Sequence, residues 1–319
     1  MVEDAISARD VRKVYRTRGQ PPVEALSGVS IRVPKGSRIS LLGRNGAGKT
    51  TFLRIASTLL LPTSGEVRVF GRDVVEDPEG VRPLIAVVPQ EGKPFFHLTP
   101  REQVYTYLRS RGFVRETAKS RTEEALSLMS LGEVADRLNV TLSGGQRQRA
   151  MVATVISTQA PLLFLDEPTI GLDPFARRGV WETLRLLTRR GSTILLTTHY
   201  LDEADVLSDR LYIVDRGRVV GEGSSEELKR TSGGTLRVTF QAPFSDGSGL
   251  EGTLSTFGPV LKEDAGGSLT LFTGPERIQE LMAIAMARKV PATVGPVTLE
   301  EAFLRLVGRS IDEEDSGGR

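Results

Sequence analysis

Residues Gly43–Thr50 read GRNGAGKT, a glycine-rich segment whose residue types suit the binding of phosphate. The segment matches the pattern G-x4-G-K-(S/T) and lies between Arg38–Leu42, which predicts a strand, and Thr50–Leu60, which predicts a helix. Glycines let backbone N–H groups turn toward phosphate oxygens, and a helix N-terminus adds the positive end of its dipole. Lys49 supplies a cation for the β- and γ-phosphates, and the Thr50 hydroxyl is a ligand for Mg²⁺. The alternative is a glycine-rich turn that only caps a helix.

A second candidate for chemistry is the acidic pair Asp166 and Glu167, which follows the apolar run Leu162–Leu165. The run predicts a strand, and two carboxylates at a buried strand end cost free energy unless a metal ion or a substrate needs them. Asp166 would then reach Mg²⁺, and Glu167 would orient or deprotonate an attacking water. The alternative is a strand end that turns into solvent, where acids are common. The phosphate loop earlier in the chain favours the catalytic interpretation.

The segment Leu142–Gln146 reads LSGGQ and opens a stretch, from Ser143 to about Thr158, that predicts a helix. Ser143 is a good N-cap residue, and the two glycines after it leave backbone N–H groups uncovered. The segment therefore has the means to bind an anion as a phosphate loop does. The alternative is a helix start that is capped by serine and binds nothing.

These three motifs stand in the order found in the ATP-binding subunits of ABC (ATP-binding cassette) transporters, and the chain resembles this family over residues 5 to 228. Further family positions are also present. Gln90 in VVPQE lies where the family has its Q-loop, Gly171–Asp173 corresponds to the D-loop, and His199 after LLTT corresponds to the switch histidine. Tyr15 in VRKVYR stands where the family stacks an aromatic ring on adenine.

The resemblance implies an ATPase that couples ATP hydrolysis to transmembrane transport, with ATP and Mg²⁺ as cofactors. The implied catalytic residues are Lys49, Gln90, Glu167 and His199, and the implied Mg²⁺ ligands are Thr50, Gln90 and Asp166. The implied nucleotide-binding residues of the two subunits are Tyr15, Gly43, Arg44, Asn45, Gly46, Ala47, Gly48, Lys49, Thr50, Thr51, Ser143, Gly144, Gly145, Gln146 and Asp173.

Three of these positions have a plainer interpretation from the residues alone. His199 follows a buried strand and is compatible with a satisfied core histidine. Tyr15 is compatible with a core aromatic, and Asp173 with the N-cap of a helix.

The resemblance also implies partners. In the family, the signature LSGGQ completes the nucleotide site of the opposite subunit, so that two copies hold two ATP molecules head to tail. We therefore expect a dimer, with an identical chain or a paralogue. Gln90 would sense a membrane-spanning permease whose cytoplasmic helix docks against Thr99–Leu138, which places the chain in the cytoplasm on the inner face of the membrane.

The alternation of predicted strands and helices indicates an α/β fold, a P-loop NTPase with a mixed sheet flanked by helices. We expect an ATPase domain over residues 1–232, with a helical subdomain inserted at about 99–150. A composition break at 231–234 separates this domain from a small α+β accessory domain at 235–309. The accessory domain begins with a predicted strand, in which the apolar residues Leu236, Val238 and Phe240 alternate with polar ones. Residues 310–319 are acidic and glycine-rich and are expected to be disordered.

Composition excludes several other classes of protein. The 42 basic and 40 acidic residues of the 319 give a formal charge of +2, which argues against a nucleic-acid coat or a polybasic membrane tether. The absence of cysteine excludes disulfides, thiol nucleophiles and Cys-ligated metals, and only two histidines are present. The N-terminus lacks the apolar core of a signal peptide, and no apolar run approaches the roughly 18 residues of a membrane span. We therefore expect another chain to span the membrane.

The C-terminal run VTLEEAFLRLVG resembles the tail of cassettes that serve ABC-2 type exporters of drugs, antibiotics, lipids or polysaccharides. The tail would stabilise a dimer, meet the permease, sense a ligand or only extend the packing. Export is therefore the expected function. The alternatives are an ABC ATPase that acts on ribosomes or DNA and a ligand-sensing regulatory ATPase; a single cassette and the charge balance favour transport, with no nucleic acid as partner.

Overall fold

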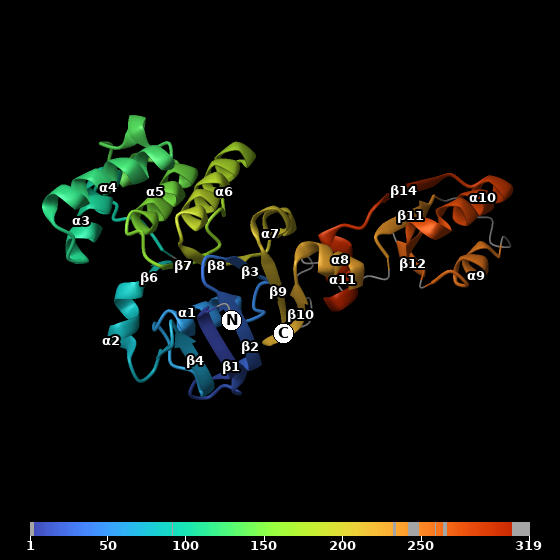
Figure 1. Cartoon of the computed structure of the whole chain (residues 1–319), viewed down its shortest axis with the longest axis horizontal. Coiled ribbons are helices and arrows are strands. Elements are labelled where there is room, and N and C mark those ends of the chain that lie inside the picture. The colour runs from blue at the N-terminus through green and yellow to red at the C-terminus, as the bar shows by residue number, and fades with distance from the viewer. Residues whose placement is uncertain are drawn as a thin grey trace. The chain divides into compact units, whose positions relative to one another are not determined.

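A parallel sheet forms the centre of the first part of the chain (Figure 1). The computed structural model describes residues 3–90, 92–231, 234–241, 249–258, 260–263 and 267–307, and the chain divides into two compact units, Met1–Glu222 and Gly223–Arg319. The strand order of the central sheet is β10-β9-β3-β8-β7-β6, and its four pairs from β9 to β6 are parallel. Its strands are β3 (Arg38–Leu42), β6 (Ile85–Val88), β7 (Leu162–Asp166), β8 (Thr193–Thr198), β9 (Arg210–Asp215) and β10 (Arg218–Gly223).

A second, antiparallel sheet has the order β2-β1-β4-β5. Its strands are β1 (Asp4–Tyr15), β2 (Val23–Pro34), β4 (Ser64–Val69) and β5 (Arg72–Asp73). One apolar cluster joins this sheet to α1 (Lys49–Ala56) and to the parallel sheet, and it includes Ile6, Phe52 and Phe164. In the second half of β2 the buried Val29, Ile31 and Val33 alternate with exposed residues, so one face of the strand packs into this cluster.

Helices cover the opposite face of the parallel sheet (Figure 1). Every residue of β7 and β8 is buried, as expected for strands covered on both faces. Thr99 caps α3 through a reciprocal pair of hydrogen bonds with Glu102, which satisfies backbone N–H groups that the first turn leaves free. The helices of this unit, some of them a single turn, are α2 (Pro78–Val81), α3 (Pro100–Ser110), α4 (Arg115–Leu128), α5 (Gly144–Ile156), α6 (Pro174–Arg189), α7 (Leu201–Leu207) and the 3₁₀ turns Arg82–Leu84, Gly132–Val134 and Asn139–Thr141.

The second unit carries an antiparallel sheet in the order β12-β13-β11-β14. The run β11-α9-β12-β13-α10-β14 is a split β-α-β-β-α-β arrangement, and Val238, Leu271, Leu254 and Leu281 share its core. Its elements are α8 (Ser225–Thr231), β11 (Leu236–Phe240), α9 (Leu250–Leu254), β12 (Val260–Glu263), β13 (Ser268–Thr273), the 3₁₀ turn Pro275–Arg277, α10 (Ile278–Arg288), β14 (Ala292–Pro296) and α11 (Leu299–Val307).

The division between the units falls at Glu222, before α8, whereas the composition break lies just after that helix. The segment 310–319, for which disorder was expected, lies outside the described residues. No helix in the described part of the chain is long and apolar enough to cross a bilayer.

Candidate active site

The glycine-rich segment forms the turn between β3 and α1. Gly48 is the N-cap residue of α1 and has φ 106°, and a Cβ atom there would lie 2.5 Å from the carbonyl oxygen of Ala25. A Cβ on Gly43 would lie 2.2 Å from the carbonyl oxygen of Val214. Only glycine fits at these two positions, so the turn depends on them.

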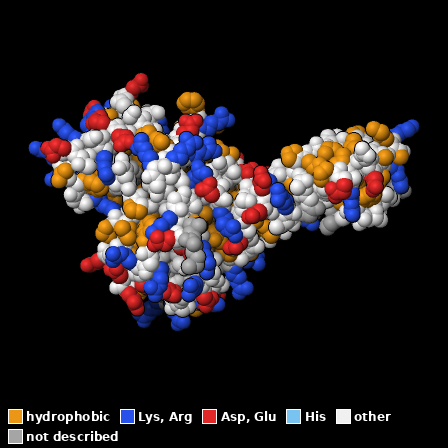
Figure 2. All heavy atoms as spheres, in the orientation of Figure 1, with side chains coloured by type: hydrophobic (Ala, Val, Ile, Leu, Met, Phe, Trp, Pro, Cys, Tyr) orange, Lys and Arg blue, Asp and Glu red, His pale blue; other side chains and the backbone are white. Residues whose placement is uncertain are grey.

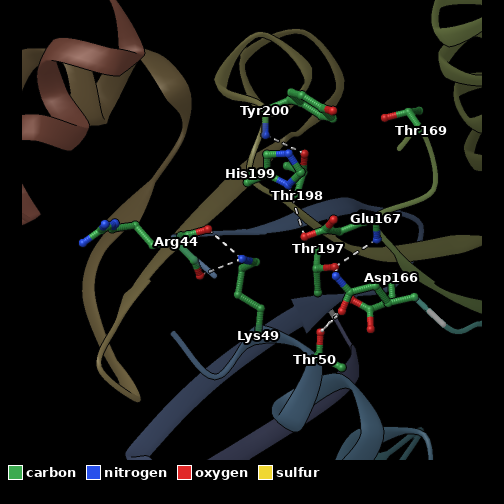
Figure 3. A network of polar contacts seen from close by, with 12 residues as sticks. Arg44, Lys49, Thr50, Asp166, Glu167, Thr169, Thr197, Thr198, His199 and Tyr200 are labelled. Carbon is green, nitrogen blue, oxygen red and sulfur yellow. Dashed lines mark hydrogen bonds and ion pairs between the residues drawn. The ribbon is translucent and has the colours of Figure 1, made fainter. Parts of the chain in front are cut away.

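Lys49 folds back over this turn (Figure 3). Its Nζ donates to the carbonyl oxygens of Gly43 at 2.6 Å and of Arg44 at 3.0 Å. Burial lowers the pKa of Lys49, although the carboxylates of Glu167 and Asp166 oppose the shift. The cation is therefore held beside the two acids, where a phosphate group would compensate its burial.

Three oxygen-bearing side chains converge at the start of α1. Thr50 Oγ1 lies 3.0 Å from Asp166 Oδ1 and 3.3 Å from Gln90 Oε1. Thr197 on β8 donates to the same Asp166 oxygen (Figure 3). Burial raises the pKa of Asp166, and the hydroxyls of Thr197 and Thr50 oppose that shift. A hydroxyl, an amide and a carboxylate form the hard oxygen donor set that suits Mg²⁺.

Glu167 lies where β7 ends, in a backbone conformation that is uncommon for a residue with a side chain. Its φ is 50°, and its N–H donates to the carbonyl oxygen (3.2 Å) and the hydroxyl (3.1 Å) of Thr197. Its Oε1 lies 3.2 Å from Nδ1 of His199. Burial works to raise the pKa of Glu167, but His199 and Lys49 outweigh it and leave the pKa lowered. The carboxylate is thus ionised at neutral pH and able to accept a proton.

A cleft of about 360 Å³ opens over these residues. Tyr15 is 37 % exposed, so it is not a core aromatic, and its hydroxyl lies 3.5 Å from Thr51 Oγ1. Glu167 and Gln90 line the same cleft. The lining residues are Tyr15, Val23, Ala25, Asn45, Gly46, Ala47, Gly48, Lys49, Thr50, Thr51, Gln90 and Glu167.

The signature and the D-loop lie outside this cleft. Ser143 caps α5, accepting from the Gln146 N–H at 3.2 Å while its own N–H donates to the Gln146 side chain at 2.9 Å. Asp173 caps α6, accepting from the N–H groups of Phe175 (3.0 Å) and Ala176 (2.9 Å), and the Ala176 N–H is the main cause of its lowered pKa. Within one chain Ser143 and Asp173 therefore serve as helix N-caps, and both residues are exposed.

The sequence analysis missed Thr197. Its hydroxyl donates to Asp166 and also accepts from the Glu167 N–H, so one side chain orients both acids. The sequence feature that could have identified Thr197 is the pair of threonines at the end of β8. The strands β7 and β8 are parallel neighbours, so residues at their ends meet at the same edge of the sheet. Among the described residues, no group of three acidic, histidine or cysteine side chains is arranged to hold a metal ion by itself.

Comparisons with known proteins agree with this geometry. The model of the ABC transporter family matches residues 26–170. The daunorubicin/doxorubicin resistance ATP-binding protein of Streptomyces peucetius is 36 % identical over 318 residues, which cover 98 % of this chain and 95 % of that protein. The Nod factor export ATP-binding protein I of Burkholderia orbicola is 34 % identical over 310 residues, which cover 97 % of this chain and 100 % of that protein.

Among solved structures, a dimeric ATP-binding cassette in a post-hydrolysis state with ADP and Pi superposes with a TM-score of 0.64 at 28 % identity. The match covers 69 % of this chain and 98 % of that one. The predicted fold class, a P-loop NTPase with a mixed sheet flanked by helices, is thereby confirmed.

Proposed function

Because this chain belongs to the family of ABC transporter ATP-binding subunits, we propose that it hydrolyses ATP in the cleft over Lys49, with Glu167 as the base, to drive export through a separate permease. Binding and hydrolysis of ATP to power a transporter follow from the family. The observation that supports the residue roles is the meeting of Lys49, Glu167 and His199 at one edge of the parallel sheet.

The chemistry divides among a few side chains. The N–H groups of the turn 43–50 and Lys49 hold the phosphates, and His199 contacts the γ-phosphate. Glu167 orients the attacking water and accepts its proton, since its carboxylate is ionised. When bound, Mg²⁺ neutralises charge that develops on the phosphate oxygens. Thr50, Gln90 and Asp166 would hold the ion, and Tyr15 would stack on the adenine.

A second subunit completes the site in this proposal. Ser143 and Gly144 are exposed and lie outside the chain's own cleft. The helix α5 begins at Gly144, and the N–H groups of its first turn have no partner within the helix. They would bind the phosphates held by the partner, and Asp173 would act across the same contact. The partner is a second copy or a paralogue.

The permease docks, we propose, on the groove lined by β6, by α3 with the turn after it and by the segment that follows α1. The groove has a volume of about 680 Å³ and is open to solvent. Pro89 at its edge precedes Gln90 directly, so a helix seated there would bear on the Mg²⁺ site. Its lining residues are Ser57, Thr58, Leu59, Arg82, Pro83, Ile85, Ala86, Val87, Pro89, Tyr107, Arg111 and Phe113.

The charges on the surface do not favour a nucleic-acid partner. Figure 2 shows acidic and basic side chains interspersed over the visible face, without one extended basic field. With a permease as partner, the subunit is bound peripherally to the cytoplasmic face of the membrane.

Two measurements test the proposal. Glu167→Gln should retain ATP binding while turnover falls by orders of magnitude, whereas Glu182→Gln, at an exposed position of α6, should hydrolyse ATP like the wild type. Tagged Glu167→Gln protein with ATP should then retain a polytopic membrane protein from solubilised membranes of the source cells. Undiminished turnover would refute Glu167 as the base, and recovery of ribosomes or DNA-bound proteins in place of a permease would refute the transport role.

A further inference from the structure

Glu203 is a carboxylic acid buried near the site but outside the cleft. It lies on α7, four residues after His199, and its exposed fraction is 0 %. It does not line the cleft and is none of the predicted site residues. Burying a carboxyl group costs free energy unless hydrogen bonds to its oxygens compensate the loss of water.

One oxygen of Glu203 accepts two hydrogen bonds from different elements. Thr169 Oγ1 donates to Oε1 at 2.8 Å, and Trp181 Nε1 donates to the same atom at 3.0 Å. Thr169 is 0 % exposed and Trp181 is 8 % exposed, so both bonds are shielded from water. We call these three residues the Glu203 clasp.

The clasp joins the two segments that carry the catalytic side chains. Thr169 stands two residues after Glu167, on the turn that leads to Asp173, and Figure 3 shows it on the segment that leaves Glu167. Glu203 stands on the helix that directly follows His199. Trp181 anchors both to α6.

Glu167 needs such an anchor because of its backbone. Its φ of 50° lies in the left-handed region, where a residue with a side chain is strained. A residue in this region keeps its place only where its surroundings hold it. Thr197 holds the N–H of Glu167 on one side, and the bond from Thr169 to Glu203 holds the turn on the other.

We propose that Glu203 is a positioning residue for ATP hydrolysis: its Oε1 holds the Thr169 turn and the His199 segment together, so that Glu167 and His199 stay 3.2 Å apart. The inference rests on the roles proposed for these two side chains. Removing the acceptor leaves two buried donors without a partner, and the turn shifts to satisfy them. A displacement of about 1 Å at a catalytic group can slow a reaction by about 100-fold.

The test compares Glu203→Leu, which removes the acceptor, with Glu203→Gln, which keeps an oxygen for Thr169 and Trp181. Val206→Ala, at an exposed position of the same helix, is the control. We expect Glu203→Leu to lower kcat about 10- to 100-fold with KM and nucleotide affinity unchanged. Glu203→Gln and Val206→Ala should stay close to the wild type.

Trp181 is the only tryptophan of the chain, so its fluorescence reports on the clasp without any need for turnover. Glu203→Leu should change its emission, and Glu203→Gln should not. Thr169→Val should also lower kcat. Because both substitutions remove the same hydrogen bond, the double variant Thr169→Val with Glu203→Leu should be no slower than Glu203→Leu alone.

Four results would overturn the inference. The first two are a wild-type kcat in Glu203→Leu and a loss of kcat in Glu203→Gln equal to that in Glu203→Leu. The other two are a loss of nucleotide binding in Glu203→Leu and a loss of its kcat that vanishes when the assay is run well below the melting temperature. The last would show a role in stability only. A wild-type chain that hydrolyses no ATP would contradict the proposed function instead, and the emission of Trp181 would still decide whether the clasp exists.

Discussion

Nδ1 of His199 lies 3.2 Å from Oε1 of Glu167, across the junction between the ends of β8 and β7. The contact is an ion pair only when the histidine is protonated, and Nδ1 receives no well-aligned hydrogen bond among the described residues. The lowered pKa of Glu167 keeps its carboxylate ionised, so it is able to accept a proton from water. In the proposed mechanism this pair places the base, Glu167, beside the γ-phosphate.

The first prediction concerns this pair. His199→Ala should lower ATP turnover by orders of magnitude while ADP affinity stays near that of the wild type, because ADP lacks the phosphate that the histidine contacts. His97→Ala, at the other histidine of the chain, is the matched control. Calorimetric titration with ADP and a phosphate-release assay measure the two quantities. Weakened ADP binding in His199→Ala would contradict the assignment.

The second prediction concerns Lys49. Lys49→Ala should weaken ATP binding itself, because Lys49 is the cation held over the phosphate turn. Lys119→Ala removes an exposed lysine of α4 and should bind ATP like the wild type. An ATP titration unaffected by Lys49→Ala would be incompatible with phosphate binding at this turn.

The third prediction separates two glycines. Gly48→Ala should destabilise the chain and abolish nucleotide binding, because its Cβ would lie 2.5 Å from the Ala25 carbonyl oxygen at φ 106°. Gly179→Ala should instead stabilise the chain by about 0.5–1 kcal/mol, since this glycine is exposed inside α6 and a Cβ meets nothing within 4 Å. Urea unfolding of both variants checks the two signs, and a loss of stability in Gly179→Ala would contradict the second.

The fourth prediction concerns pH and Glu203. Burial raises the pKa of Glu203 above the ordinary 4.5, and the polar side chains of Thr198, Thr169 and Trp181 oppose that shift. Between the unfolded and the folded pKa the folded state holds more protons, so this group makes the free energy of unfolding fall as pH rises. Glu203→Gln lacks the charge, so its stability relative to the wild type should grow with pH across that window. Urea unfolding at pH 5 and pH 8 measures the difference, and a constant difference would show that the carboxyl group ionises as freely as in the unfolded chain.

The fifth prediction tests the second subunit. Ser143→Arg and Lys49→Ala should each be inactive as pure proteins, because in a symmetric dimer each substitution impairs both nucleotide sites. In a mixed dimer one site has an intact Lys49 from one chain and an intact Ser143 from the other. Mixing the two inactive proteins should therefore restore ATP turnover. No recovery on mixing would contradict a site that is shared between chains.

Much of the cleft could be predicted because its chemistry lies in short, local patterns. Gly43–Thr50 is one turn with its helix start, and Asp166 and Glu167 are adjacent, so a single element positions each group. The order of these motifs along the chain indicated the family, which pointed to Gln90, His199 and Tyr15. Ser143 and Asp173 were predicted to bind nucleotide, and the same residues are also N-caps; their helix starts are visible in the sequence for the same local reason.

The amino-acid sequence was sufficient to identify the phosphate turn, the acid pair and the helix caps. Local backbone conformation dictates which residue types can stand at these positions, so the types reveal the local structure. Only the tertiary structure revealed that Thr197 orients both acids and that Glu203 joins Thr169 to Trp181. It likewise decided the strand order of the second unit. These hydrogen bonds join residues 22 to 34 positions apart, and no local pattern encodes which distant groups meet once the apolar faces are buried.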